Sequence, residues 1–340
     1  MNKKIYSDII FDLIHRYNIE SNDDFESTKK SFGNISLESY DITNEYQSKT
    51  LGKEIGKYRL LSVPCPLDIS HSETTKIVNI LKNILYELMG NISNKDRVLI
   101  VGLGNRHISA DSLGTKVIKK IGITFGGHFP KVMAICPSVL GLTGIETFDI
   151  VKGVIDNVKP THIIFIDSLC ASNVSRLGKS IQLTNTGICP GSGIGNKRKC
   201  LNSSLAKHVV SIGVPLLIYA NTFVGNNMEK YRINHSRLNS IMQKVKKYEN
   251  NSDFVDLIND LKACTQDSID DIIVSLKDIE ECVDILSKII SKAINLSLGV
   301  NVLNDWLFHK INYEKNAMGK YGCNCNYMYC NTFCFCAISD

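Results

Sequence analysis

The fold is decided by the stretch RVLIVGLGN at residues 97–105, in which a short apolar run leads directly into a turn with two glycines. An uninterrupted run of β-branched and aliphatic residues is typical of a strand buried on both faces of a sheet. A second stretch of the same kind, residues 162–166, leads into Asp167. Two such strands, separated by helical patterns, predict a parallel sheet with helices on its faces.

Working outward from these strands, apolar runs and helical periodicities alternate along the chain. Strands are expected at residues 58–63, 98–101, 131–135 and 162–166, and helices at 75–88, 111–120 and 145–158. A further apolar run at 209–220 reads as a buried strand or pair of strands, with a break at Pro215. The predicted fold class is therefore α/β, with a mostly parallel sheet and helices on both faces.

The chain is expected to divide into four parts. Residues 1–50 are rich in Asn, Ser, Asp and Glu and read as a loosely structured leader, a possible propeptide, with one short helix at 5–16. Residues 51–228 form the α/β core, and residues 229–312 read as a C-terminal helical subdomain with helices near 237–248, 253–261 and 279–301. The tail, residues 313–340, is rich in cysteine.

Composition and patterning exclude several classes of protein. The net charge of +5 arises from 39 basic and 34 acidic residues spread along the chain without a dense basic block, so nucleic-acid binding is not indicated. No apolar stretch reaches the roughly 18 to 20 residues of a membrane helix, and the first residues are not a secretory signal. We therefore expect a soluble cytoplasmic protein.

The twelve cysteines fall into two groups. Seven are scattered singly and are expected to be reduced, buried thiols: Cys65, Cys136, Cys170, Cys189, Cys200, Cys264 and Cys282. The other five lie close together in the tail: Cys323, Cys325, Cys330, Cys334 and Cys336. They are compatible with a site for a soft metal ion or with an oxidation-prone tail, and the sequence does not decide between these alternatives.

Two carboxylates follow the predicted strands. Functional groups of a doubly wound sheet gather beyond the carboxyl ends of its strands, where Asp111 and Asp167 are both expected. If the two strands are neighbours, the carboxylates face one crevice and share a proton. Asp111, near a helix start, then acts as the base that activates water, and Asp167 as the acid that protonates the leaving amine. The plainer alternative is that Asp111 caps a helix and Asp167 forms a turn.

A glycine-rich loop at residues 190–198 gives a second signal, because its backbone N–H groups can form a nest that holds a substrate backbone or an oxyanion. The alternative is a flexible surface loop. The loop lacks the Gly-Lys-Ser/Thr ending of a nucleotide-binding loop, and no cofactor or metal is predicted. The expected substrate-binding residues are Gly104, Asn105, Gly191, Ser192, Gly193, Gly195, Asn196, Lys197 and Arg198.

Four of these stretches, in this order, resemble the spore germination protease family, whose fold is related to that of the hydrogenase-maturation proteases. The stretches are residues 102–114, 140–147, 166–169 and 186–198, within a resemblance that runs from about residue 50 to 225. It implies a phosphorylase/hydrolase-like, maturation-protease-like fold and places the two catalytic aspartates at Asp111 and Asp167. It further implies a zymogen that loses an N-terminal leader, assembles as a homotetramer and degrades small acid-soluble spore proteins in the spore core.

The chain also departs from the family's usual pattern near the crevice. The family usually has Pro where Ala110 stands, Gly where Ser138 stands and Asp where Asn185 stands. These departures motivate one alternative function, that of a degenerate paralogue that binds spore proteins without cutting them. Another alternative is a metal-dependent maturation-type protease in which His107 and Cys189 join the aspartates, and a third is a Cys189–His107 nucleophilic pair.

Overall fold

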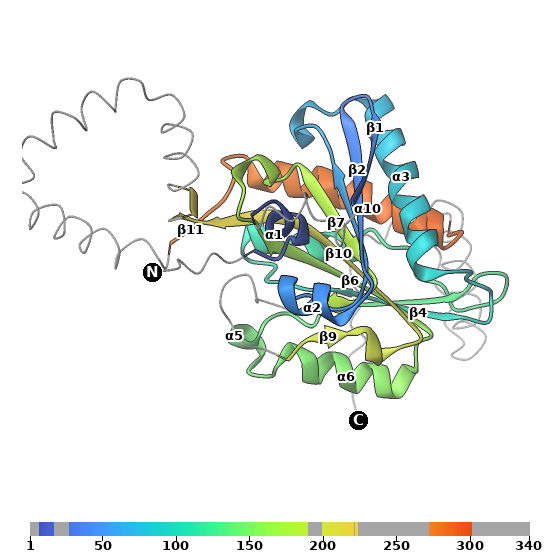
Figure 1. Ribbon diagram of the computed structural model, residues 1–340. Helices are drawn as coiled ribbons and strands as arrows, with labels where there is room; N and C mark the ends of the chain where they lie inside the picture. Colours follow the sequence, from blue (N-terminus) through green and yellow to red (C-terminus); the bar gives the residue numbers. More distant parts are fainter. Residues whose placement is uncertain (1–6, 17–26, 190–198, 221, 224–271, 301–340) are drawn as a thin grey trace, which may run out of the picture. The chain divides into compact units, whose positions relative to one another are not determined.

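A nine-stranded mixed sheet forms the centre of the protein (Figure 1). The computed structural model describes residues 7–16, 27–189, 199–220, 222–223 and 272–300. The strands lie in the order β1-β2-β3-β7-β10-β6-β4-β5, and β11 pairs with β10. Their bounds are β1 Ser27–Phe32, β2 Ile35–Ile42, β3 Gly56–Ser62, β4 Arg97–Gly102, β5 Lys131–Ile135, β6 His162–Cys170, β7 Ser180–Thr184, β10 His208–Tyr219 and β11 Ile273–Val274.

The parallel part of the sheet is the half that ends at β5. Strands β10, β6, β4 and β5 pair in parallel, whereas β1, β2, β3 and β7 pair antiparallel. The predicted strands of the core are confirmed, and so is a mostly parallel core. The antiparallel strand β7 was not predicted; it joins the parallel half to the hairpin strands.

One face of the sheet is covered by three helices. They are α3 His71–Met89, α4 Leu113–Ile118 and α10 Ile279–Ser297, and α10 packs against both of the others. Helix α3 begins with a capping box, in which the Ser70 side chain and the Glu73 carboxylate satisfy each other's backbone N–H groups. Its buried positions, among them Ile77, Leu81 and Leu88, share one side and contribute to the largest hydrophobic cluster. The helix predicted at 279–301 is thus part of this layer.

The opposite face is covered by helix α6 Thr147–Val158 and, further along the sheet, by α1 Ile10–Arg16 and α2 Glu45–Leu51. Val151 and Ile155 of α6 pack on Phe165 of β6, as expected from their spacing. A short helix, α5 Leu140–Thr143, precedes α6. A small antiparallel pair, β8 Gly187–Ile188 and β9 Leu201–Asn202, lies on this side, because Leu201 belongs to the same cluster.

The expectation of a loosely structured first fifty residues is wrong for residues 27–51. These form the hairpin β1–β2 and helix α2, and β2 pairs with β3 over seven residues. The short helix predicted at 5–16 is confirmed as α1. The division of the chain at residues 50, 228 and 312 stays a prediction, and the helices predicted near 237–248 and 253–261 lie outside the described residues, as does the cysteine-rich tail.

Three element boundaries differ from those predicted. Strand β6 continues to Cys170, so Asp167 lies inside the strand and not beyond its end. The helix predicted at 111–120 is the shorter α4, preceded by a 3₁₀ turn at Ser109–Asp111. Strand β10 continues through Pro215, where the break that was expected is a register shift between Pro215 and Leu217.

The cysteines differ in part from expectation. Cys170 and Cys282 are buried free thiols, as predicted, but Cys136 is exposed. Cys189 and Cys200 form a disulfide, so the prediction that these two cysteines are reduced thiols is wrong. They follow β8 and precede β9, so the antiparallel pairing of those strands brings the two cysteines opposite each other. Within the described ranges, no helix is both long and apolar enough to cross a membrane.

Candidate active site

The two predicted aspartates lie at the carboxyl ends of neighbouring parallel strands. Strand β4 pairs with β6 along its length, ending with Gly102 opposite Ile166, and Asp167 is the next residue of β6. Beyond β4 the chain stays against β6, since the Leu103 N–H donates to the Ile166 carbonyl at 2.8 Å. The condition set by the sequence, that these strands be neighbours, is therefore met, and the loop that carries Asp111 begins beside Asp167.

Asp111 is held by the glycine turn that follows β4. Gly104 has a φ of +98°, and a Cβ added there would lie 2.1 Å from the Asp111 carbonyl oxygen and 2.8 Å from its Oδ1, so only glycine fits. The next residue, Asn105, donates its backbone N–H to Asp111 Oδ2 at 2.8 Å. Such a bond favours the ionised carboxylate. The turn thus fixes both the position of the Asp111 side chain and an environment suited to its charge.

Helix α4 approaches the sheet closely because of a second glycine. A Cβ at Gly114 would lie 2.4 Å from the Leu103 carbonyl oxygen and 2.7 Å from the Ile166 carbonyl oxygen. The first turn of α4 therefore packs directly on the backbone at the ends of β4 and β6. This contact places the 3₁₀ turn that carries Asp111 over the end of the sheet, and it explains the glycine of the sequence Asp111-Ser112-Leu113-Gly114.

Asp167 is the buried member of the pair, with 7 % of its surface exposed. Its pKa is raised well above the ordinary aspartate value, first by burial, then by the negative charges of Asp111 and Asp8, against a smaller opposite effect of the Ser168 N–H. That N–H donates to Asp167 Oδ1 at 2.9 Å. Asp167 therefore keeps its proton at a pH where an exposed aspartate has lost it. A buried carboxyl group that keeps its proton can serve as the acid in general acid–base catalysis.

A third carboxylate, Asp8, was not predicted as a site residue. Its Oδ2 accepts the Cys170 N–H at 2.9 Å, and its own N–H donates to the Cys170 carbonyl at 2.9 Å. Lys53 donates to the Asp8 carbonyl at 3.2 Å. The signal in the sequence was the apolar run Ile9-Ile10-Phe11 directly after Asp8, a pattern typical of a segment that packs on a core.

The segment of residues 7–16 is anchored beside Asp8 by buried polar contacts. Asp12 pairs with Arg176 at 2.6 Å and accepts the Ser172 N–H at 2.8 Å. The Ile10 N–H donates to Gln182 Oε1 of β7 at 3.0 Å. The side chains of Ile9, Ile10 and Phe11 are buried, which ties this segment to the sheet face that bears Asp167.

The remaining predicted site residues are only partly described. Residues 190–198, with the predicted substrate-binding Gly191 to Arg198, lie outside the described residues. The Asn105 N–H is taken by Asp111, and its Oδ1 accepts the His107 N–H at 2.9 Å, so the contacts seen for Asn105 support the aspartate loop. Cys189 is bound to Cys200, which contradicts its reading as a free nucleophile or metal ligand. Within the described part of the chain, no group of three or more His, Cys, Asp or Glu side chains is placed to hold a metal ion.

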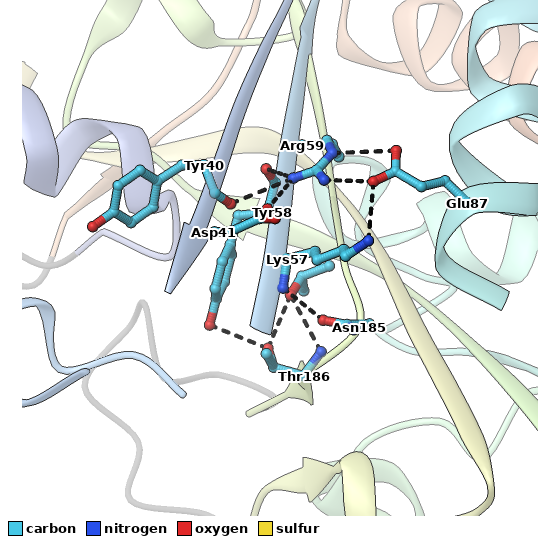
Figure 2. A network of polar contacts seen from close by, with 9 residues as sticks. Tyr40, Asp41, Lys57, Tyr58, Arg59, Glu87, Asn185 and Thr186 are labelled. Atoms are coloured by element: carbon cyan, nitrogen blue, oxygen red, sulfur yellow. Dashed lines mark hydrogen bonds and ion pairs between the residues drawn. The ribbon is translucent and has the colours of Figure 1, made fainter. Parts of the chain in front are cut away.

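A polar network fixes strand β3 at the border of this region (Figure 2). Arg59, 6 % exposed, bonds to Asp41 of β2 and to Glu87 of α3, and Lys57 lies 3.6 Å from the same Glu87 carboxylate. At the other end of the network, the Lys57 N–H donates to Asn185 Oδ1 at 2.8 Å. The network joins β3 to a helix on one side and to the segment after β7 on the other.

Comparison with known proteins identifies the family of this chain. The model of the germination protease family matches residues 12–251, which is more than half of the chain. The chain belongs to the germination protease family. Membership makes it a peptidase and confirms the resemblance that the sequence motifs indicated.

Individual germination proteases match over most of their length. The protein of Caldanaerobacter subterraneus subsp. tengcongensis is 35 % identical over 271 residues, which are 76 % of this chain and 82 % of that protein. The germination protease of Clostridium perfringens strain ATCC 13124 is 30 % identical over 311 residues, or 85 % of this chain and 92 % of the relative. That of Bacillus subtilis strain 168 is 35 % identical over 225 residues, 62 % of this chain and 60 % of the relative.

Among solved structures, the [NiFe] hydrogenase maturation protease HycI of Thermococcus kodakarensis is similar to this chain over 39 % of its length and 80 % of the other protein. The two are 19 % identical in sequence, with a TM-score of 0.29.

Ser138, a position at which the family resemblance predicts glycine, has a backbone conformation that glycine adopts more readily than serine. Its φ is +67°, in the left-handed region that non-glycine residues rarely adopt. The Ser138 carbonyl accepts a bond from the Thr147 hydroxyl at 3.2 Å, which ties the residue to the start of α6. The departure from the family pattern is therefore accommodated with backbone strain, and the chain path is kept.

Proposed function

We propose that this protein is an endoprotease that degrades small acid-soluble spore proteins during germination, with Asp111 and Asp167 as its catalytic pair. The observation that carries the proposal is that Asp167 is buried on β6 beside the end of β4, from which the chain continues to Asp111, and that the charge of Asp111 contributes to the raised pKa of Asp167. The family to which the chain belongs supports the protease activity.

The proposed reaction uses one carboxyl group in each protonation state. Asp111, whose carboxylate accepts the Asn105 N–H, takes a proton from a water molecule as the water oxygen attacks the scissile amide carbon. Asp167 donates its proton to the amide nitrogen, and the C–N bond breaks to leave a carboxylic acid and an amine. Afterwards Asp111 holds a proton and Asp167 has lost one, and a transfer between them through solvent restores the starting state.

The test is cleavage of a purified small acid-soluble spore protein, followed by mass spectrometry of the products. We expect the wild type to give discrete fragments, and Asp111→Asn and Asp167→Asn to lose at least about 100-fold in rate, since each removes one partner of acid–base catalysis. Asp156→Asn is the matched control, because Asp156 is an exposed residue of α6 that pairs with Lys152 one helical turn before it. Wild-type rates in either crevice variant would contradict the catalytic assignment, and an inactive wild type would favour the degenerate paralogue.

The proposal includes a zymogen form, a homotetrameric assembly and action in the cytoplasm of the spore. The zymogen is supported by the packing of residues 7–16 beside Asp167, where the negative charge of Asp8 adds to that of Asp111. Mass spectrometry of the chain incubated alone at mildly acidic pH tests the loss of a leader, and light scattering tests the tetramer. An intact mass at all times and a monomeric scattering mass would contradict these two parts.

A further inference from the structure

A cavity with polar and apolar walls lies one strand away from Asp167 on the same face of the sheet. Its volume is about 220 Å³, far above the roughly 10–15 Å³ needed for one water molecule. Gly213 forms part of its wall, and this residue pairs with Asp167 on one side and with Gln182 of β7 on the other. The cavity therefore begins one strand away from Asp167, where the side chain of Leu169, another lining residue, packs over Gly213.

The wall of this cavity holds a buried hydroxyl group without a partner. Ser211 of β10 is 3 % exposed, and among the residues that the structure describes its Oγ finds no hydrogen-bond partner. Burial of a hydroxyl without a hydrogen bond is unfavourable, so native proteins seldom leave one in this state. Since Ser211 lines the cavity, the group that completes its bonding is expected to enter the cavity.

The hydroxyl groups next to Ser211 are fixed by one another. Thr184, the β7 residue opposite Ser211, lies 3.0 Å from the Thr186 hydroxyl oxygen, and this oxygen lies 3.3 Å from the Tyr58 phenol oxygen (Figure 2). Tyr58 donates its own proton to the Glu54 carbonyl at 2.8 Å. The row of hydroxyls is thus preorganised, and Ser211 stands at its inner end as the donor that is not used.

The charged groups around the cavity disfavour a charged guest. Burial lowers the pKa of Lys53 and raises the pKa of Glu54, so this environment disfavours the charged form of a basic and of an acidic group. Asp8 lies beside Lys53 and offsets its charge. A neutral side chain with both an acceptor and a donor matches these walls, because its oxygen can accept from Ser211 while its N–H groups donate to Glu54 or to the Thr184 hydroxyl, which do not belong to the proposed leader.

We propose that this cavity is a substrate subsite that receives a neutral carboxamide side chain, that of Asn or Gln, from the peptide being cleaved. The inference rests on the proposed protease function. Ser211 is one strand across and two residues back from Asp167, a separation of roughly 8 Å between Cα atoms from ordinary strand spacings. An extended peptide advances about 3.3 Å per residue, so the carboxamide belongs to a residue two or three positions from the scissile bond.

The test uses fluorogenic peptides that span a cleavage site mapped in a small acid-soluble spore protein. Each of the three positions on either side carries Gln, Glu, Leu or Ala in turn, and kcat/KM is measured for the wild type, Ser211→Ala and Ser180→Ala. We expect one position at which the wild type prefers Gln about tenfold over Leu and Ala, which is the effect of one buried neutral hydrogen bond. In Ser211→Ala the ratio of Gln to Ala at that position falls about tenfold.

Ser180 is the matched control, because it is a buried serine of β7 that does not line the cavity, and Ser180→Ala should keep the wild-type ratio. Thr184→Val, which removes a neighbouring hydroxyl, gives a second test if Ser211→Ala is poorly folded. Equal rates for Gln and Leu at every position, or a preference for Glu, would overturn the subsite while leaving the protease intact. A wild type that cuts none of the peptides and no spore protein would instead refute the protease on which the subsite depends.

Discussion

At the scale of single residues, the account depends on the different surroundings of two aspartates. Asp111 lies on a loop with a backbone donor at its carboxylate, whereas Asp167 lies within a strand and is almost wholly buried. The same environment that keeps Asp167 protonated also makes its ionised form costly for the fold. Activity and stability are therefore expected to depend on Asp167 in opposite ways.

Replacing Asp167 by Asn should abolish cleavage and yet raise the free energy of unfolding at neutral pH. Because the pKa of Asp167 is raised in the folded state, its stabilising contribution is complete below the unfolded value near 3.9 and is lost as the pH rises through the folded pKa. Each pH unit over which only the folded state keeps the proton is worth about 1.4 kcal/mol. Urea unfolding at pH 5 and pH 8 measures the effect, and a variant less stable than the wild type at pH 8 would contradict it.

The proximity of Asp111 and Asp167 could be predicted because each follows an apolar run typical of a parallel strand, and the carboxyl ends of parallel strands share one edge of the sheet. Asp8 could not be found in this way. Its place depends on contacts with Cys170 and Lys53, which are 162 and 45 residues away, and no local pattern encodes such contacts. Ser211 was missed for a similar reason, since a serine within an apolar strand gives no sign of the cavity beside it.

At the scale of elements, the helices and parallel strands with strong periodicity were predicted, and the polar strands were not. Strand β1 is exposed along its whole length, so it shows no alternation of apolar and polar residues. Strand β7 is buried at all five positions but includes Ser180, Gln182 and Thr184, so it lacks the continuous apolar run by which the other buried strands were predicted. Tertiary pairing, with β3 on one side and β10 on the other, decides its conformation.

The turn before α6 offers a prediction about Ser138. A non-glycine residue in the left-handed region is strained by about 1–2 kcal/mol relative to glycine. Glycine also increases the conformational entropy of the unfolded chain, which offsets part of the stability gained by relieving this strain. Ser138→Gly should therefore raise the free energy of unfolding by roughly 0.5–1 kcal/mol. Thermal unfolding compares it with Ser109→Gly, where no positive φ is present and destabilisation is expected. A loss of stability in Ser138→Gly would show that the strain is not released.

The disulfide between Cys189 and Cys200 gives a second prediction for an element, the pair β8–β9. It closes a loop with a sequence separation of 11 residues, for which the chain-entropy account gives a stabilisation of about 2–3 kcal/mol. The double substitution Cys189→Ser with Cys200→Ser should lower the free energy of unfolding by about that amount in the absence of reductant. Adding reductant should bring the wild type to the level of the variant. Equal stability of the wild type with and without reductant would contradict a disulfide in the purified protein.

At the scale of the whole molecule, the two ends of the parallel sheet respond to pH in opposite directions. Asp167 lies at the carboxyl end, and a stacked pair, His162 and His208, lies at the amino ends of β6 and β10 with ring centroids 4.7 Å apart. The pKa of His162 is lowered chiefly by burial and next by the neighbouring His208, with a smaller contribution from Lys207. The negative charge of Asp96 raises this pKa and opposes part of the shift. Acidification is therefore expected to stabilise one end and destabilise the other.

The stabilising contribution of neutral His162 is complete above the unfolded histidine value near 6.5 and is lost as the pH falls through the lowered folded pKa. Between pH 7 and pH 5 the free energy of unfolding of the wild type should therefore fall more than that of His162→Gln. This difference in slope is expected whatever the stability of the variant at neutral pH. Urea titrations at half-unit intervals compare the two slopes. Parallel curves for the two proteins would show that His162 does not titrate differently in the folded and unfolded states.

The central claim is that Asp111 and Asp167 form one coupled acid–base pair, and the direct measurement is the titration of Asp167 by NMR. The chain is labelled with ¹³Cγ aspartate, and the Asp167 signal is assigned by its absence in Asp167→Asn. We predict that Asp167 keeps its proton well above the ordinary aspartate range in the wild type, and that Asp111→Asn lowers its pKa by removing the neighbouring charge. An Asp167 that titrates as an ordinary aspartate, or one unaffected by Asp111→Asn, would contradict the paired mechanism.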